Sequence, residues 1–108
     1  MDSTQPVRRF RRYRTDFRVK VHFTAAGQTQ SIIARTYEMS PGGLSVYAPT
    51  EIPADAEIKL DLTLPGDHQT MHLGAEVRNR IGFRYGMEFQ PLTREQENRI
   101  RSFCSDLT

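Results

Sequence analysis

Residues 17–23 read Phe-Arg-Val-Lys-Val-His-Phe, with an apolar side chain at every second position from Phe17 and Val19 onward. This period of two is typical of a β-strand that buries one face and leaves the other in water. Residues 57–64, Glu-Ile-Lys-Leu-Asp-Leu-Thr-Leu, repeat the alternation more regularly. These two stretches predict that the chain folds around half-buried strands.

Four further segments show weaker forms of the same pattern and are also expected to be strands. They are residues 30–37, 44–48, 69–80 and 83–89. In the last of them, Phe83, Tyr85, Met87 and Phe89 are expected to point inward. The segments around Gly27, Ser40–Gly43 and Gly66 separate the strands and are expected to be tight turns.

The end of the chain follows a helical pattern. Thr93, with Gln96 three residues later, resembles a capping box at the start of a helix. The residues that then recur at helical spacing are Ile100, Phe103, Cys104 and Leu107. Six short strands joined by tight turns favour closure into a barrel, because closure removes exposed edges. The predicted fold class is therefore all-β, a six-stranded antiparallel β-barrel with a C-terminal α-helix.

The length of 108 residues is that of one domain. We expect a flexible Arg-rich arm over residues 1–13 and a single barrel domain over residues 14–108. The single cysteine excludes an intramolecular disulfide and suits a reducing compartment, so the cytoplasm is the expected location. No apolar run approaches the roughly 18 residues of a membrane span, and the first residues lack an apolar signal core. Membrane insertion is therefore not expected.

Charge is distributed unevenly along the chain. Residues 1–20 hold seven basic and two acidic side chains, whereas residues 21–108 carry a net charge of −3. Six of the seven basic residues are arginines, whose planar guanidinium suits phosphate oxygens and guanine edges. The arginines of the arm therefore predict a partner that carries phosphate. The alternative is that the arm binds nothing and is simply a solvated leader. The acidic remainder argues against DNA or RNA, since nucleic-acid binding needs positive charge along a whole face.

No catalytic or metal-binding set stands out. The three histidines, His22, His68 and His72, are expected to be solvated, with His68 and His72 too far apart on a strand to share a metal. The sequence contains none of the common hydrolase, metalloprotease or P-loop motifs. We therefore expect a protein that is not an enzyme and that has no cofactor.

Two short motifs remain, about twenty residues apart. The first is Arg14-x-x-x-Arg18, at the junction of the arm and the first strand. The second is Glu38-x-Ser40-x-x-Gly43, which combines an acid, a hydroxyl and a glycine bend. Ser40 could donate to a phosphate oxygen, and a glycine lets backbone amides approach a ligand closely.

Taken together and in this order, the motifs resemble the signature of the PilZ family of cyclic di-GMP receptors, R-x-x-x-R followed by [D/N]-x-S-x-x-G. Tyr85–Phe89, a short linker and a helix also resemble the family's ending. The resemblance covers roughly residues 8–107. It implies that cyclic di-GMP is the ligand and that binding orders the arm and relays to an unidentified protein partner. Motility, biofilm formation and pilus assembly are the processes it suggests.

The resemblance also implies the residues of the site. Arg14 and Arg18 would clamp phosphates and guanine edges, an arm arginine would stack on a base, and Ser40 and Gly43 would meet the ligand. The full set of candidates is Arg11, Arg12, Arg14, Arg18, Glu38, Ser40, Gly42, Gly43 and Arg78. Arg78 is expected either to line the rim of the site or to be a solvated strand residue.

Two departures from the family signature and a second possible register leave alternatives open. Position 38 is Glu where the family has Asp or Asn, and Tyr13 stands where many members have Arg. Arg8-x-x-x-Arg12 has the same spacing as the preferred pair. The alternative function is a degenerate PilZ domain that acts as a protein-interaction adaptor without nucleotide.

Overall fold

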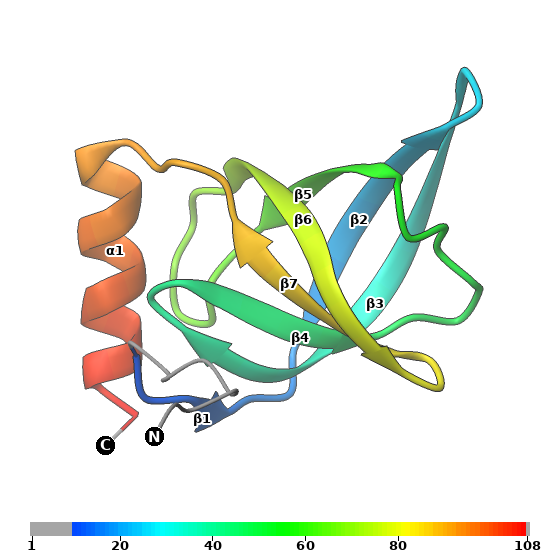
Figure 1. The fold of residues 1–108 in the computed structure, drawn as a ribbon. Helices are drawn as coiled ribbons and strands as arrows, with labels where there is room; N and C mark the ends of the chain where they lie inside the picture. Colours follow the sequence, from blue (N-terminus) through cyan, green and yellow to red (C-terminus); the bar gives the residue numbers. More distant parts are fainter. Residues whose placement is uncertain (1–9, 108) are drawn as a thin grey trace, which may run out of the picture.

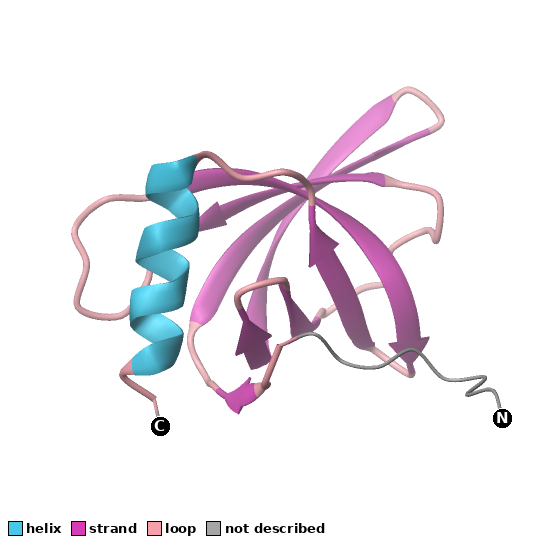
Figure 2. Ribbon diagram, turned by 60° about the vertical axis from the view of Figure 1, so that its left-hand side comes forward, coloured by secondary structure: helices cyan, strands magenta, loops and turns pink. Residues whose placement is uncertain are grey.

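The computed structural model describes residues 10–107 and has one β-barrel with one helix beside it (Figures 1 and 2). The elements are β1 (Tyr13–Arg14), β2 (Arg18–Ala25), β3 (Gln28–Ser40), β4 (Gly43–Tyr47), β5 (Glu57–Leu62), β6 (Met71–Ile81), β7 (Arg84–Phe89) and α1 (Arg94–Ser105). Within this part of the chain, no helix has the length and apolar character needed to cross a membrane.

The barrel is closed and entirely antiparallel. Around the ring the strands follow the order β3-β2-β5-β6-β7-β4, and β4 pairs with β3 to complete the circle. Closure satisfies the backbone hydrogen bonds that an open sheet would leave at its edges. The predicted six-stranded barrel is thus confirmed, with β1 as a short additional strand that lies along β3.

Alternation places the core inside the ring. Val19, Val21 and Phe23 of β2 are at most 3% exposed, while the residues between them face outward. Ile58 and Leu60 of β5 are fully buried in the same way. The loop between β4 and β5 closes one end of the barrel, where the backbone N–H of Ile52 donates to the hydroxyl of buried Tyr85 over 2.9 Å.

Two expected core residues lie outside. Phe83, expected to point inward, is 54% exposed. It lies with Gly82, which adopts φ 61°, in the two-residue turn between β6 and β7. Leu107, expected on the buried stripe of the helix, is 38% exposed, because α1 ends at Ser105.

The helix begins as expected and packs beside the barrel (Figure 1). The Thr93 hydroxyl accepts from the backbone N–H of Gln96, whose side-chain oxygen accepts from the backbone N–H of Thr93. Ile100 and Cys104 are buried against the barrel, and Phe103 meets Phe17 edge to face at 5.9 Å. Burial raises the pKa of the Cys104 thiol, as expected of a core residue rather than a nucleophile.

Two irregularities interrupt the ladders. The β3–β4 register shifts between Thr36 and Glu38, so Tyr37 is an extra residue on β3. The β6–β7 register shifts between Val77 and Asn79, so Arg78 is an extra residue on β6. A bulge of this kind bends the strand and re-aims nearby side chains. The first of the two shapes the face described next.

Candidate functional site

The first sequence motif lies beside the second, because β1 and the start of β2 both pair with β3. Arg14 of β1 is the register partner of Glu38, and Arg18 at the start of β2 is the partner of Arg35. Between them the Thr15 N–H donates to the carbonyl of Tyr37 over 3.0 Å. Since β4 pairs with the other edge of β3 over residues 35–40, β1 and β2 run along the same edge. Both motif arginines are exposed.

The bulge in β3 gives this face two consecutive outward residues. Thr36 and Met39 are buried, while Tyr37 and Glu38 between them are both partly exposed. In a regular strand one of these two neighbours would point into the core. The bulge instead sets an aromatic ring and a carboxylate next to each other beside Arg14.

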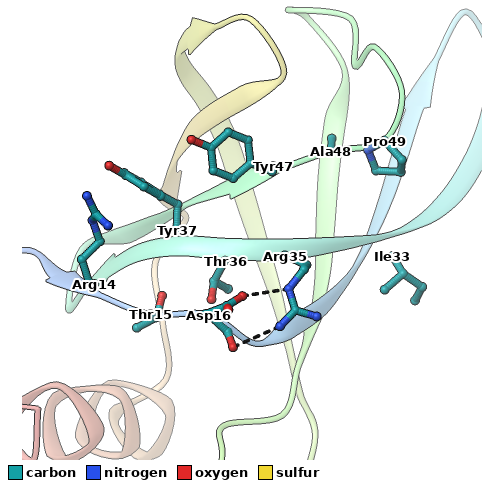
Figure 3. Close-up of a pocket in the computed structure, with 10 residues that line it drawn as sticks. All are labelled: Arg14, Thr15, Asp16, Ile33, Arg35, Thr36, Tyr37, Tyr47, Ala48 and Pro49. Atoms are coloured by element: carbon teal, nitrogen blue, oxygen red, sulfur yellow. Dashed lines mark hydrogen bonds and ion pairs between the residues drawn. The ribbon is translucent and has the colours of Figure 1, made fainter.

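A shallow hollow of about 560 Å³ lies over this part of β3 (Figure 3). One wall comes from the segment before β2, with Arg14 and Asp16, and the other from Tyr47 at the end of β4. Its ten lining residues are Arg14, Thr15, Asp16, Ile33, Arg35, Thr36, Tyr37, Tyr47, Ala48 and Pro49. Ile33 is 51% exposed and gives the hollow an apolar part.

Two lining residues of the hollow, Asp16 and Arg35, form an ion pair. The Nε of Arg35 donates to the carboxylate of Asp16 over 2.8 Å, and its terminal nitrogen donates to the Asp16 carbonyl over 3.4 Å (Figure 3). The side chains are 52% and 75% exposed, so the pair contributes little to stability. It does fix Asp16, which lies inside the Arg14-x-x-x-Arg18 motif.

Tyr37 is the centre of an aromatic and cationic cluster. The guanidinium carbon of Arg14 lies 4.2 Å from the centroid of the Tyr37 ring, and that of Arg84 lies 4.5 Å from it. Tyr47 meets the same ring edge on at 5.5 Å. Both arginines are within the range of cation–π attraction. Among residues 10–107, neither has a carboxylate within ion-pair distance.

The turn of the second motif is built by its own residues. Ser40 Oγ accepts from the backbone N–H of Gly42 over 3.1 Å. A Cβ on Gly42 would lie 2.9 Å from the ring of Phe10, and a Cβ on Gly43 would overlap the carbonyl oxygen of Met87 on β7. Gly43 is therefore required by the packing of the chain itself, whatever ligand it contacts, whereas a side chain at position 42 would need the Phe10 ring to shift.

Arg18 lies outside the hollow around Tyr37. It lines a second hollow of about 550 Å³ together with Lys20, Asp61 and His72. Within the described residues Arg18 has no ion-pair partner. Ile33 lines both hollows, so they adjoin across β3 and β2.

The histidines differ from the expectation that all three are simply solvated. His22 Nε2 lies 2.8 Å from one carboxylate oxygen of Asp61, and His72 Nδ1 lies 2.8 Å from the other. The cluster forms because β2 and β6 both pair with β5, which brings residues distant in sequence to one place. The His22 hydrogen bond, and then that of His72, hold the pKa of Asp61 below its usual value despite burial. No group of three metal-binding side chains occurs within residues 10–107.

The remaining candidates are only partly brought together. Arg11 and Arg12 are exposed, and the Arg11 guanidinium lies 5.6 Å from the Tyr13 ring. Arg78 lies on β6, the strand opposite β3 in the ring, and its guanidinium pairs with Glu88 at 2.6 Å and Glu76 at 3.2 Å. Arg8 and most of the expected arm lie outside the described residues.

Sequence reasoning missed Arg35, Tyr37, Tyr47 and Arg84. Tyr37 precedes Glu38 in the chain, so an aromatic residue next to the second motif was an available signal. For Arg84 the sequence held no such signal. Arg84 comes near β3 only because β7 pairs with β4, which places it opposite Tyr47.

Comparisons with known proteins identify the family and the fold. The sequence profile of the PilZ domain matches residues 6–106. The PilZ domain of CeSA from a cellulose-synthesizing bacterium aligns with a TM-score of 0.63 at 19% identity, covering 90% of this chain and 94% of that one. The PilZ domain of YcgR from Escherichia coli, solved with c-di-GMP, aligns with a TM-score of 0.62 at 20% identity, covering 93% and 90%.

A further neighbour is the inhibitor of motility MotI/DgrA of Bacillus subtilis, with a TM-score of 0.66 at 18% identity over 94% of this chain and 51% of that one. The chain matches no curated protein by sequence. At these identities the solved structures establish the fold, and the profile establishes the family. The chain belongs to the PilZ domain family.

Proposed function

We propose that this domain is a receptor for cyclic di-GMP, bound on the outer face of β3 between Arg14-x-x-x-Arg18 and Glu38-x-Ser40-x-x-Gly43. The observation that carries the proposal is the pairing of Arg14 with Glu38, which brings the two motifs to one face beside a hollow. YcgR, a structural neighbour, was solved with c-di-GMP, which supports the choice of ligand.

The chemistry of this face suits the two phosphates and two guanines of the ligand. Arg14 and Arg18 are exposed and have no ion-pair partner among residues 10–107. A guanidinium can form two parallel hydrogen bonds with a phosphate or with the O6/N7 edge of guanine. Glu38 is proposed to accept from a guanine N–H group or to hold an arginine in place. Arg11 and Arg12 are proposed to close over the ligand.

A second candidate is an adaptor that works without nucleotide. One observation favours it: Arg14 already stacks on Tyr37, so a guanidinium proposed to meet the ligand is engaged within the protein itself. In either case the output is proposed to pass to a protein partner. Motility is one such process, and a structural neighbour is named as an inhibitor of it.

Titration calorimetry with cyclic di-GMP, with GTP and linear diguanylate as comparison ligands, tests the receptor proposal. The protein is expected to bind the cyclic ligand in the micromolar range or tighter. Arg18→Ala is expected to weaken binding by about 2 kcal/mol, since a charge-assisted contact is lost. The matched control is Arg94→Ala, an exposed arginine on α1, which should leave the affinity unchanged.

Absence of heat with cyclic di-GMP would reject the receptor and leave the adaptor. Equal affinities of the Arg18→Ala variant and the unaltered protein would instead place the ligand elsewhere on the barrel.

A further inference from the structure

The ring of Tyr37 occupies a position between two guanidinium groups that come from different strands. Arg14 belongs to β1, which lies along one edge of β3, and Arg84 belongs to β7, which lies beyond β4 on the other side. Their guanidinium carbons are 4.2 and 4.5 Å from the ring centroid. Tyr47 holds the ring edge on from β4.

This arrangement is one that a purine base could also use. A guanidinium plane attracts the π-face of a ring, and a purine offers a larger face than a phenol. Two guanidiniums around one ring, with no carboxylate paired to either within residues 10–107, also favour an anionic ligand. In the structure this place belongs to a side chain of the protein itself.

From this geometry we infer that Tyr37 is a built-in competitor of the ligand: a guanine base takes its place between Arg14 and Arg84, and the phenol ring must swing out first. Arg84 is thereby a ligand-contacting residue outside both sequence motifs. The inference rests on the proposed function, because it assumes that the base reaches this face.

The ring is free to move in the way this requires. Tyr37 is the extra residue of the bulge and is partly exposed, and the structure gives its hydroxyl no hydrogen bond with the described residues. Its neighbours Thr36 and Met39 carry the packing into the core. Rotation of the Tyr37 side chain therefore leaves the barrel intact.

If only a fraction of the free molecules have the Tyr37 ring displaced, the apparent affinity for the ligand equals the intrinsic affinity multiplied by that fraction. Removing the ring should remove that loss. Tyr37→Ala is expected to bind cyclic di-GMP about fivefold to tenfold more tightly than the unaltered protein, the scale of two exposed cation–π contacts. Tyr37→Phe keeps the ring and should leave the affinity unchanged.

The role of Arg84 gives a sharper test, because it depends on the background. In the unaltered protein Arg84 contacts the Tyr37 ring before binding and the guanine ring after binding. Its contribution therefore largely cancels, and Arg84→Ala should change the affinity by less than about threefold. In the Tyr37→Ala background Arg84 stacks only in the complex, so its loss should cost about tenfold. Arg94→Ala is the control in both backgrounds and should have no effect in either.

A spectroscopic readout separates competition from a merely structural role. The chain has no tryptophan, so Tyr37→Trp introduces a single reporter at the position in question. Its emission is expected to move to longer wavelength as cyclic di-GMP displaces the indole from the stack into water. The titration should follow the same binding curve as calorimetry.

The possible failures are distinct. If the unaltered protein binds and Tyr37→Ala binds more weakly, Tyr37 itself is the platform for the base and the inference is wrong. Indole emission of the Tyr37→Trp variant that stays constant at saturation also overturns it. If neither the unaltered protein nor Tyr37→Ala binds, the proposed function fails. Binding by Tyr37→Ala alone supports the inference in its strongest form.

Discussion

At the scale of single residues, Asp61 shows how neighbours set a charge. Its carboxylate lies between His22 and His72, and both hydrogen bonds favour the ionised form. They hold the pKa of Asp61 below its usual value, with His22 as the larger cause. Because the folded pKa lies below that of the unfolded chain, this contribution to stability is present above about pH 4. It is lost as the pH falls through the folded pKa.

Asp61→Asn is therefore expected to lower the free energy of unfolding by about 1 kcal/mol at pH 7. The difference from the unaltered protein should shrink as the pH falls below about 4. Urea unfolding between about pH 3 and pH 7 measures both effects. The matched control is Asp55→Asn, an exposed carboxylate in the loop before β5. A difference between Asp61→Asn and the unaltered protein that is constant with pH would contradict the assignment.

At the scale of elements, the β2–β3 hairpin carries a visible strain. Ala26 adopts φ 51° and Gly27 φ 76°, so both turn residues are in the left-handed region. Gly tolerates this conformation, whereas alanine incurs a steric penalty in it. Asparagine adopts it more readily, and Asn-Gly is a preferred pair for two-residue hairpins.

Ala26→Asn is accordingly expected to raise the free energy of unfolding by about 0.5–1 kcal/mol. Thermal and urea unfolding report the change. Ala54→Asn is the control, an exposed alanine in the β4–β5 loop whose φ is outside the left-handed region. Equal effects of the two substitutions would mean that the gain does not come from the turn.

The elements also show which parts of the structure can be predicted from the sequence. Strict alternation in residues 17–23 and 57–64 predicts β2 and β5, and the capping box predicts the start of α1. Alternation breaks down at the bulge, so the pattern predicts a second strand that ends at residue 37, although β3 continues to Ser40. A local pattern cannot reveal a register shift, because the shift is defined by the partner strand.

The candidate site could be predicted only in part, because it too depends on which strands pair. The motif residues Arg14 and Glu38 come from one stretch each, and their pairing follows from the order of the first strands. Arg84 and the Asp61 cluster depend on pairings between strands that are distant in sequence. The prediction that Phe83 points inward was wrong because Phe83 lies at the tip of a hairpin, in a turn set by the positive φ of Gly82.

At the scale of the whole molecule, the helix and the barrel share one hydrophobic core. Ile100 is fully buried and belongs to the same cluster as Val21 and Leu60 of the barrel. Phe103 adds its edge-to-face contact with Phe17. A single shared core in a small domain favours cooperative, two-state unfolding.

Ile100→Ala is expected to lower the free energy of unfolding by about 3 kcal/mol, through lost burial and the cavity left behind. Far-UV circular dichroism, which reports the helix, and tyrosine fluorescence, which reports the barrel, should give coincident urea transitions in both proteins. Ser102→Ala, an exposed position on the same helix, is the control. Loss of the helical signal before the tyrosine signal would show that α1 is a separate unit.

The bulge in β3 has a consequence for how this face can change over generations. Tyr37 and Glu38 both look outward only because one additional residue separates buried Thr36 from buried Met39. A deletion there would restore strict alternation with Thr36 and Met39 still inward, and would leave one outward side chain where there are now two. A substitution would leave the spacing intact. Chain length at this corner therefore decides how many side chains the face presents, whereas exchange of side chains alters its chemistry without altering that number.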